Sequence, residues 1–203
     1  MQPRTDFKLV LLGDPGVGKT TFIQHELTGE ITNEYHPTKR YTQFAVPFTI
    51  TTQSQIKSVN FDVWDISGGH GRASTRAQYI KDADAAIIMF DLSNRQTMKN
   101  VVNWYRELIH ATGTPIPFAV YGAKQDLDRS ASEVNNPDSL TWPSEMGHVD
   151  YFQGSRKEVD GDIERPFLSL LRQLYNDSEL VGFFAVIMIV KGEQRILTRD
   201  RNL

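Results

Sequence analysis

The chain has 203 residues, of which 39% are hydrophobic and 23% charged, the balance of a soluble globular protein with one domain. Its net charge of −3 argues against a general nucleic-acid-binding surface, so we expect no nucleic acid among its partners. Because it has no cysteine, disulfides, cysteine-ligated metals, prenylation and palmitoylation are excluded. The longest apolar stretch, Leu180–Val190, is too short for a transmembrane helix, which needs about 20 residues. We therefore expect a cytosolic or nuclear chain without a lipid anchor.

A glycine-rich segment follows the first apolar run. Phe7–Leu12 is predicted to be a buried strand, Gly13–Thr20 reads GDPGVGKT, and apolar residues then recur at helical spacing as far as Leu27. Strand, glycine loop and helix in this order are the context of a phosphate-binding P-loop. Its backbone N–H groups can surround a phosphate chain, and the helix N-terminus adds positive potential. Lys19 can then reach the β- and γ-phosphates, while the Thr20 hydroxyl can hold Mg²⁺.

Two segments with alternating hydrophobicity come next, at residues 44–50 and 59–63. The polar stretch Thr51–Gln55 separates them, which predicts an antiparallel hairpin at one edge of the sheet. An acidic residue, Asp65, follows the second strand and can hold Mg²⁺ through water. Gly68 has no Cβ, so its N–H can approach a γ-phosphate closely.

The middle and end of the chain continue the alternation of strands and helices. Ala85–Phe90 reads as a buried strand, and a helical pattern over residues 98–109 follows a capping residue, Ser93 or Asn94. A second amphipathic stripe extends over Ile163–Leu174. This order predicts an α/β fold with a mainly parallel sheet and helices on both faces.

A short polar motif follows another predicted strand, Phe118–Tyr121. In α/β folds, ligands bind at the carboxyl ends of the strands, where Lys124 and Asp126 are expected to lie. The carboxylate can accept both hydrogen bonds from the N1 and N2 edge of guanine, which adenine cannot donate, and the lysine stem can cover the base. P-loops also serve kinases and motor ATPases, but the three motifs together predict GTP or GDP as ligand and Mg²⁺ as cofactor.

Several longer segments carry a family resemblance: FKLVLLGDPGVGKTTF, HELTGE, FDVWD, AAIIMFDL, NWYREL and ERPFLSLLRQL. Over Asp6 to Tyr175 the chain resembles the small GTPase superfamily, and within it the Ran family of nuclear-transport GTPases. The resemblance implies the P-loop NTPase fold, with a GTPase domain over residues 1–176 and a C-terminal extension over residues 177–203. It also implies GTP hydrolysis, location in nucleus and cytoplasm, and three partner classes: transport receptors of the importin-β class, a nucleotide exchange factor and a GTPase-activating protein.

The resemblance adds residues to the candidate site. Thr38 looks like the threonine that binds Mg²⁺ in the triphosphate state, and Ser155 begins a segment that looks like the loop supporting guanine. The candidate nucleotide-binding residues are Gly13, Asp14, Pro15, Gly16, Val17, Gly18, Lys19, Thr20, Thr21, Tyr35, Thr38, Gly68, Ala123, Lys124, Asp126, Ser155, Arg156 and Lys157. The candidate metal ligands are Thr20, Thr38 and Asp65, and the candidate catalytic residues are Lys19, Gly69 and His70.

Three of the departures from the family pattern bear on nucleotide binding and hydrolysis. Gly69 stands where relatives carry the glutamine that orients the attacking water, so intrinsic hydrolysis should be very slow. His70 could substitute, although a solvated loop histidine is the other interpretation. Ala123 stands where relatives carry asparagine, a loss that should reduce affinity roughly 10- to 100-fold. Pro15 lacks the N–H of the glycine common at its position, which removes one possible phosphate donor.

The C-terminal extension also departs from the Ran pattern. Its end is basic, with Lys191, Arg195, Arg199 and Arg201, whereas Ran proteins end in an acidic run. The apolar run Phe183–Val190 would be an aggregation hazard if it were free. We therefore expect it to dock on the domain as a strand or helix, or to cover a partner; contact with a membrane surface is the alternative.

Three hypotheses for the function remain open from the sequence. The first is a Ran-like GTPase whose hydrolysis is slow or depends on a partner. The second is a nucleotide-binding interaction module that scarcely hydrolyses, for which Gly69 and Ala123 are the evidence. The third is a P-loop enzyme acting on another substrate.

Overall fold

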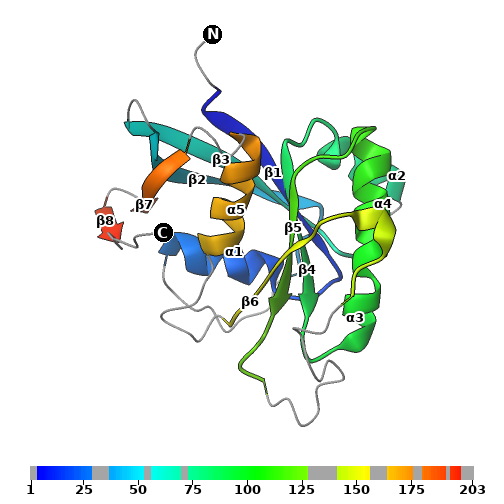
Figure 1. The fold of residues 1–203 in the computed structure, drawn as a ribbon. Coiled ribbons are helices and arrows are strands. Elements are labelled where there is room, and N and C mark those ends of the chain that lie inside the picture. Colours follow the sequence, from blue (N-terminus) through cyan, green and yellow to red (C-terminus); the bar gives the residue numbers. More distant parts are fainter. Residues whose placement is uncertain are drawn as a thin grey trace.

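The computed structural model describes residues 4–28, 37–52, 56–69, 73–127, 141–155, 164–175, 180–190 and 193–197. Its described strands form one eight-stranded sheet in the order β6-β5-β4-β1-β3-β2-β7-β8 (Figure 1). In chain order the elements are β1 (Asp6–Gly13), α1 (Lys19–Thr28), β2 (Tyr41–Thr52), β3 (Ile56–Ile66), α2 (Ala73–Ile80), β4 (Ala85–Asp91), α3 (Arg95–Lys99), α4 (Val101–Thr112), β5 (Phe118–Ala123), the short 3-10 helix η3 (Ser144–Met146), β6 (Asp150–Gln153), α5 (Glu164–Leu174), β7 (Leu180–Val190) and β8 (Glu193–Leu197).

The central strands are parallel, as predicted. β1 pairs with β3 on one side and β4 on the other, and β5 joins β4 to β6 in the same direction. Strands β4 and β5 are buried along their whole length, which explains their nearly continuous apolar sequences. The carboxyl ends of β1, β3, β4, β5 and β6 therefore meet at one edge of the sheet.

Helices cover both faces of the sheet, which confirms that part of the predicted fold class (Figure 1). On one face, Phe22 of α1 and Phe167 of α5 pack on alternate residues of β1 such as Leu9. On the other face, α2 and α4 cover the intervening positions, among them Val10. Two hydrophobic cores thus hold the sheet between them.

The predicted hairpin is present, and the sheet extends beyond it. β2 and β3 pair antiparallel from Tyr41 opposite Ile66 to Thr51 opposite Ile56. Within the described sheet, however, β2 is not the outer strand, because β7 pairs antiparallel with it and β8 pairs with β7. An apolar extended segment can satisfy its backbone polar groups by joining an open strand edge, and this is the docked alternative expected for the C-terminal extension. The domain boundary after residue 176 stays a prediction.

The helical pattern predicted over residues 98–109 is divided into two helices. Asn94 is the N-cap of α3, and its side chain accepts a hydrogen bond from the Gln96 N–H at 3.0 Å. Asn100 separates α3 from α4, and Gly113 ends α4 in the left-handed conformation with φ 74°. None of the described helices is long and apolar enough to cross a bilayer.

Candidate nucleotide-binding site

The P-loop backbone requires the glycines of its motif. Gly16 and Gly18 have φ of 76° and 103°, a region that residues with a Cβ rarely adopt. A Cβ on Gly13 would lie 2.2 Å from the Met89 carbonyl oxygen of β4. These restrictions shape the turn between β1 and α1, which confirms the predicted strand, loop and helix.

Lys19 is buried inside this turn, with only 6% of its surface exposed. Its Nζ donates hydrogen bonds to the carbonyl oxygens of Gly13 at 2.8 Å and Asp14 at 3.0 Å. Burial lowers the pKa of Lys19 to about 8, against the opposing effect of the Asp65 and Asp14 carboxylates, and the charge of Arg76 lowers it further. The ammonium is thus held at the loop, where a phosphate would stabilise its charge.

Three side-chain oxygen groups meet beside the P-loop. The Thr20 hydroxyl donates to Asp65 Oδ2 at 2.5 Å and lies 3.0 Å from the Thr38 hydroxyl, which in turn lies 3.4 Å from Asp65 Oδ2. Asp65 is fully buried, and its Oδ1 has no hydrogen-bond partner among the described residues. Burial raises the pKa of Asp65, although the Thr20 hydrogen bond, the Lys19 charge and the Thr38 hydrogen bond oppose this.

This donor set fits Mg²⁺, which prefers oxygen ligands and is commonly held by few protein groups together with water and phosphate. A buried carboxylate oxygen without a partner would gain from a cation next to it. Thr20, Thr38 and Asp65 would therefore hold the ion, which would neutralise charge on the phosphates. The predicted metal ligands are brought together from α1, the segment before β2, and the end of β3.

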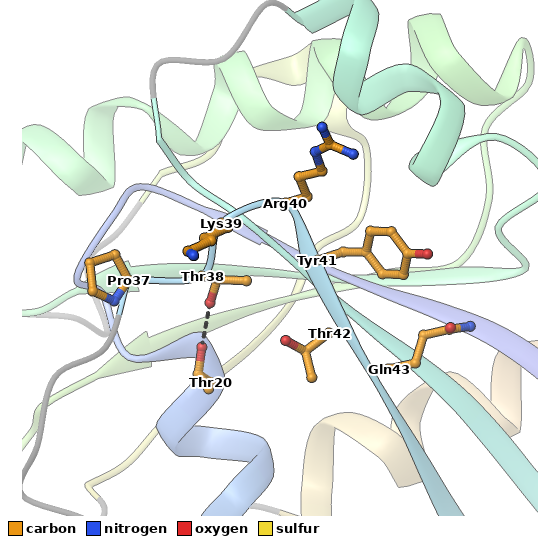
Figure 2. Close-up of a pocket in the computed structure, with 8 residues that line it drawn as sticks. All are labelled: Thr20, Pro37, Thr38, Lys39, Arg40, Tyr41, Thr42 and Gln43. Carbon is orange, nitrogen blue, oxygen red and sulfur yellow. Dashed lines mark hydrogen bonds between the residues drawn. The ribbon is translucent and has the colours of Figure 1, made fainter.

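A pocket of about 800 Å³ opens beside the metal ligands. Figure 2 shows that Thr38 faces Thr20, whereas Arg40 and Tyr41 point away from that pair. The lining residues are Thr20, Pro37, Thr38, Lys39, Arg40, Tyr41, Thr42 and Gln43. The pocket thus places the proposed metal site next to open space in which a ligand could lie.

The two glycines after β3 have different surroundings. A Cβ on Gly68 would lie 2.2 Å from the Gly13 carbonyl oxygen and 2.6 Å from Pro15 N, so Gly68 is required for close packing on the P-loop. Among the residues that the structure describes, a Cβ on Gly69 would meet only Ser67 Oγ, at the ordinary contact distance of 3.5 Å. The described residues around position 69 therefore impose no packing constraint that explains its lack of a side chain.

Contacts at the carboxyl ends of β4, β5 and β6 hold the predicted base-binding residues. The Lys124 Nζ forms an ion pair with Asp91 Oδ2 at 2.6 Å, and Lys124 has a positive φ of 65°. The Ser155 hydroxyl, 2% exposed as a residue, donates a hydrogen bond to Asp126 Oδ1. Ala123 ends β5 and offers no side-chain hydrogen bond. Ser155 therefore positions the carboxylate that is expected to recognise guanine.

The structure also shows contacts that the sequence analysis missed. Asn100 and Trp104 of the α4 region donate hydrogen bonds to the Asp14 carboxylate of the P-loop. Arg76 of α2 donates to the Gly69 carbonyl oxygen and pairs with Glu107 of α4. No periodicity or motif spacing connects these positions. The only available signal was Asp14 itself, a carboxylate inside a phosphate-binding loop that needs partners of its own.

Most of the predicted site residues lie together at the carboxyl edge of the sheet. Val17 is buried in the first core and Thr21 lies in the first turn of α1. Four predicted residues lie outside the described residues: Tyr35, His70, Arg156 and Lys157.

The comparison with known families agrees with this geometry. A family model described as Ras family matches residues 8–176. The chain belongs to the Ras family. As a Ras-family protein it is a small GTPase that binds guanine nucleotide, and members of this family typically bind Mg²⁺ with it. The P-loop, the oxygen cluster and the base-binding residues all lie within the matched segment, so the hypothesis of a P-loop enzyme with another substrate is not retained.

Proposed function

We propose that this Ras-family GTPase is Ran-like, acts in nucleocytoplasmic transport in nucleus and cytoplasm, and hydrolyses GTP very slowly without a partner. The arrangement of Lys19 with Thr20, Thr38 and Asp65 supports Mg²⁺-dependent nucleotide binding. Gly69 carries the proposal of slow hydrolysis, because it offers no side-chain group to an attacking water.

The hydrolytic step would be phosphoryl transfer to water. In such reactions, positioned positive charge stabilises the charge on the transferred group, and a separate residue orients the water. Lys19 and the P-loop N–H groups supply the first contribution, and Gly68 can bring its N–H to the γ-phosphate. The second contribution would come from His70 or from a GTPase-activating protein.

Restoring an amide at position 69 tests the hydrolytic part of the proposal. Gly69→Gln should raise the single-turnover rate of [γ-³²P]GTP hydrolysis at least tenfold, because positioned groups of this kind contribute roughly 10²- to 10⁴-fold. Gly69→Ala is the matched control, since it adds a Cβ without an amide. An unchanged rate in Gly69→Gln, with GTP shown to be bound, would contradict the proposal.

The transport part rests on the sequence segments shared with Ran proteins. We expect the chain loaded with a non-hydrolysable GTP analogue to bind a purified receptor of the importin-β class, and the GDP-loaded chain to bind it at least tenfold more weakly. Equal binding of the two forms, or none, would contradict a Ran-like role.

The alternative function, an interaction module that binds nucleotide but scarcely hydrolyses it, is favoured by Gly69 and Ala123. The nucleotide released by denaturing the purified protein distinguishes this module from a slow GTPase. Bound GDP supports a slow switch, whereas GTP that stays uncleaved supports a module held in one state.

A further inference from the structure

One face of the α4 region contacts the P-loop directly and reaches the segment after β3 through Arg76 of α2. Asn100 begins this face, Trp104 lies one turn further along the helix, and Glu107 follows about one turn later. Asn100 and Trp104 contact Asp14 of the P-loop. Glu107 contacts Arg76, whose side chain donates a hydrogen bond to the Gly69 carbonyl oxygen. Two loops from distant parts of the sequence therefore depend on a single helix.

The P-loop end of this arrangement is centred on Asp14. Its Oδ2 accepts a hydrogen bond from Asn100 Nδ2 at 2.7 Å, and its Oδ1 accepts one from Trp104 Nε1, also at 2.7 Å. The backbone carbonyl of the same residue accepts from Lys19 Nζ at 3.0 Å. The side chain of Asp14 thus fixes a carbonyl group that positions the P-loop lysine.

The other end is centred on Arg76. Its Nε and Nη2 pair with the two carboxylate oxygens of Glu107 at 2.7 and 2.8 Å, while Nη1 donates to the Gly69 carbonyl oxygen at 2.9 Å. The guanidinium carbon lies 4.9 Å from the centre of the Trp104 ring. The side chains of Arg76 and Glu107 are only 15% and 14% exposed, so this ion pair is shielded from solvent more than ordinary surface pairs are.

We propose that Asn100, Trp104, Glu107 and Arg76 form a brace that fixes the P-loop and residue 69 relative to each other and thereby controls nucleotide release. The proposal rests on the guanine-nucleotide binding described above. Arg76 and Trp104 are positioning residues, because they act on the ligand through Gly69 and Asp14. We call this set the α4 brace.

The two ends of the brace should affect different parts of the nucleotide. Asp14 belongs to the loop that holds the phosphate chain of both GDP and GTP. Gly69 follows the Gly68 N–H that can approach the γ-phosphate, which only GTP carries. Loosening the Asp14 end should therefore weaken both nucleotides, whereas loosening the Arg76 end should weaken the triphosphate more.

Trp104→Phe tests the Asp14 end, because it keeps an aromatic ring and removes the N–H donor. Release of radiolabelled GDP and of a radiolabelled non-hydrolysable GTP analogue should both accelerate about tenfold, since a hydrogen bond to a charged group is lost. Asn100→Ala, which removes the other donor, should act in the same direction. Trp142→Phe is the matched control, because Trp142 packs near Phe90 and Tyr151 in the same hydrophobic core as Trp104 but does not belong to the α4 brace.

Arg76→Met tests the other end. Release of the GTP analogue should accelerate at least fivefold, and release of GDP less than twofold. Arg106→Met is the control, because Arg106 lies on α4 and forms an exposed ion pair with Glu145 at 2.6 Å. A purely structural role for Arg76 would change both nucleotides equally, and that result would overturn the proposal.

Hydrogen exchange in the ligand-free protein gives a measurement that does not depend on nucleotide. Peptides covering residues 13–18 should exchange faster in Trp104→Phe than in the unmutated chain or in Trp142→Phe. Unchanged exchange there, with unchanged release rates, would overturn the brace. If the unmutated chain held neither nucleotide, the function would be contradicted instead, and the exchange result would still decide whether the brace holds the P-loop.

Discussion

The phosphate end of the site and its base end are assembled differently. At the phosphate end, the side chains of Lys19, Thr20, Thr38 and Asp65 already contact one another or the P-loop. At the base end, Asp126 is oriented by Ser155 and the Lys124 ammonium is paired with Asp91, but Ala123 has no polar side chain. Phosphate and metal contacts should therefore provide most of the affinity, and a single carboxylate most of the preference for guanine.

Removing the P-loop ammonium should have the largest effect. Lys19→Met should weaken GDP and GTP binding more than about 100-fold, because it removes charge-assisted hydrogen bonds to phosphate. Isothermal titration at neutral pH measures this change. Lys8→Met is the control, since Lys8 lies over the Trp64 ring, on β1 but outside the P-loop. Similar nucleotide affinities in the two variants would show that contacts at the phosphate end do not provide most of the binding free energy.

The base end is tested by Asp126→Ala. GTP affinity should fall roughly 10- to 100-fold through loss of two hydrogen bonds to a carboxylate, while ATP affinity should stay the same. Competition of GTP and ATP against a labelled nucleotide gives both values. Asp6→Ala, which removes an exposed carboxylate at the opposite end of β1, should change neither. Equal GTP and ATP affinity in the unmutated protein would refute the assigned role of Asp126.

Ala123→Asn should make the base end more like the phosphate end, because it adds a polar side chain where the base end has none. The added amide should raise GTP affinity about tenfold, which is the gain expected from one or two new polar contacts. Ala45→Asn on β2 introduces the same side chain at an exposed position and serves as control. A decrease in affinity would indicate that the base end, with Lys124 paired to Asp91, does not accommodate a side chain larger than alanine at position 123.

The effect of pH should be the smallest and should come from Lys19. In the ligand-free fold its pKa is about 8, below the ordinary value of 10.5, so the unfolded chain binds more protons between these two values. Stability of the ligand-free protein should therefore rise with pH over that window. A bound phosphate should stabilise the charged form of Lys19, so nucleotide binding should take up a proton above pH 8. The affinity for nucleotide should therefore fall about fourfold from pH 7 to 8.5.

Isothermal titration of the protein with nucleotide, in two buffers of different ionisation enthalpy, would detect the uptake of this proton. Lys19→Arg stays charged throughout and corrects for titration of the nucleotide itself. If the unmutated chain took up no more protons than Lys19→Arg, the low pKa would not influence binding.

The sequence predicts the parts of the site that depend on backbone conformation and local order. The P-loop needs glycine at Gly16 and Gly18, and the buried strands need continuous apolar runs, so both can be recognised in a single segment of chain. The Asn94 cap is similarly local. Such features follow from a few neighbouring residues, whatever the rest of the fold does.

Contacts between distant segments could not be predicted in this way. Asp14 meets Asn100 and Trp104 across more than 80 positions of sequence. The division between α3 and α4 was missed for a related reason. The pattern of apolar residues continues across Asn100, but the side chain of that residue makes its hydrogen bond to the P-loop instead of capping α4. The pairing of β7 with β2 likewise depends on which strand edge is open in the folded sheet.

The attachment of β7 to β2 has a practical consequence for any shortened form of this protein. The pairing joins Thr49 to Ala185 and Ile50 to Phe184, at the end of β2 remote from Thr38. A chain cut at the predicted domain boundary would keep every candidate site residue but leave these backbone groups of β2 without their present neighbour. Unpaired strand edges promote self-association, so such a fragment could precipitate with an intact binding site. Loss of solubility on truncation would therefore say nothing about nucleotide binding.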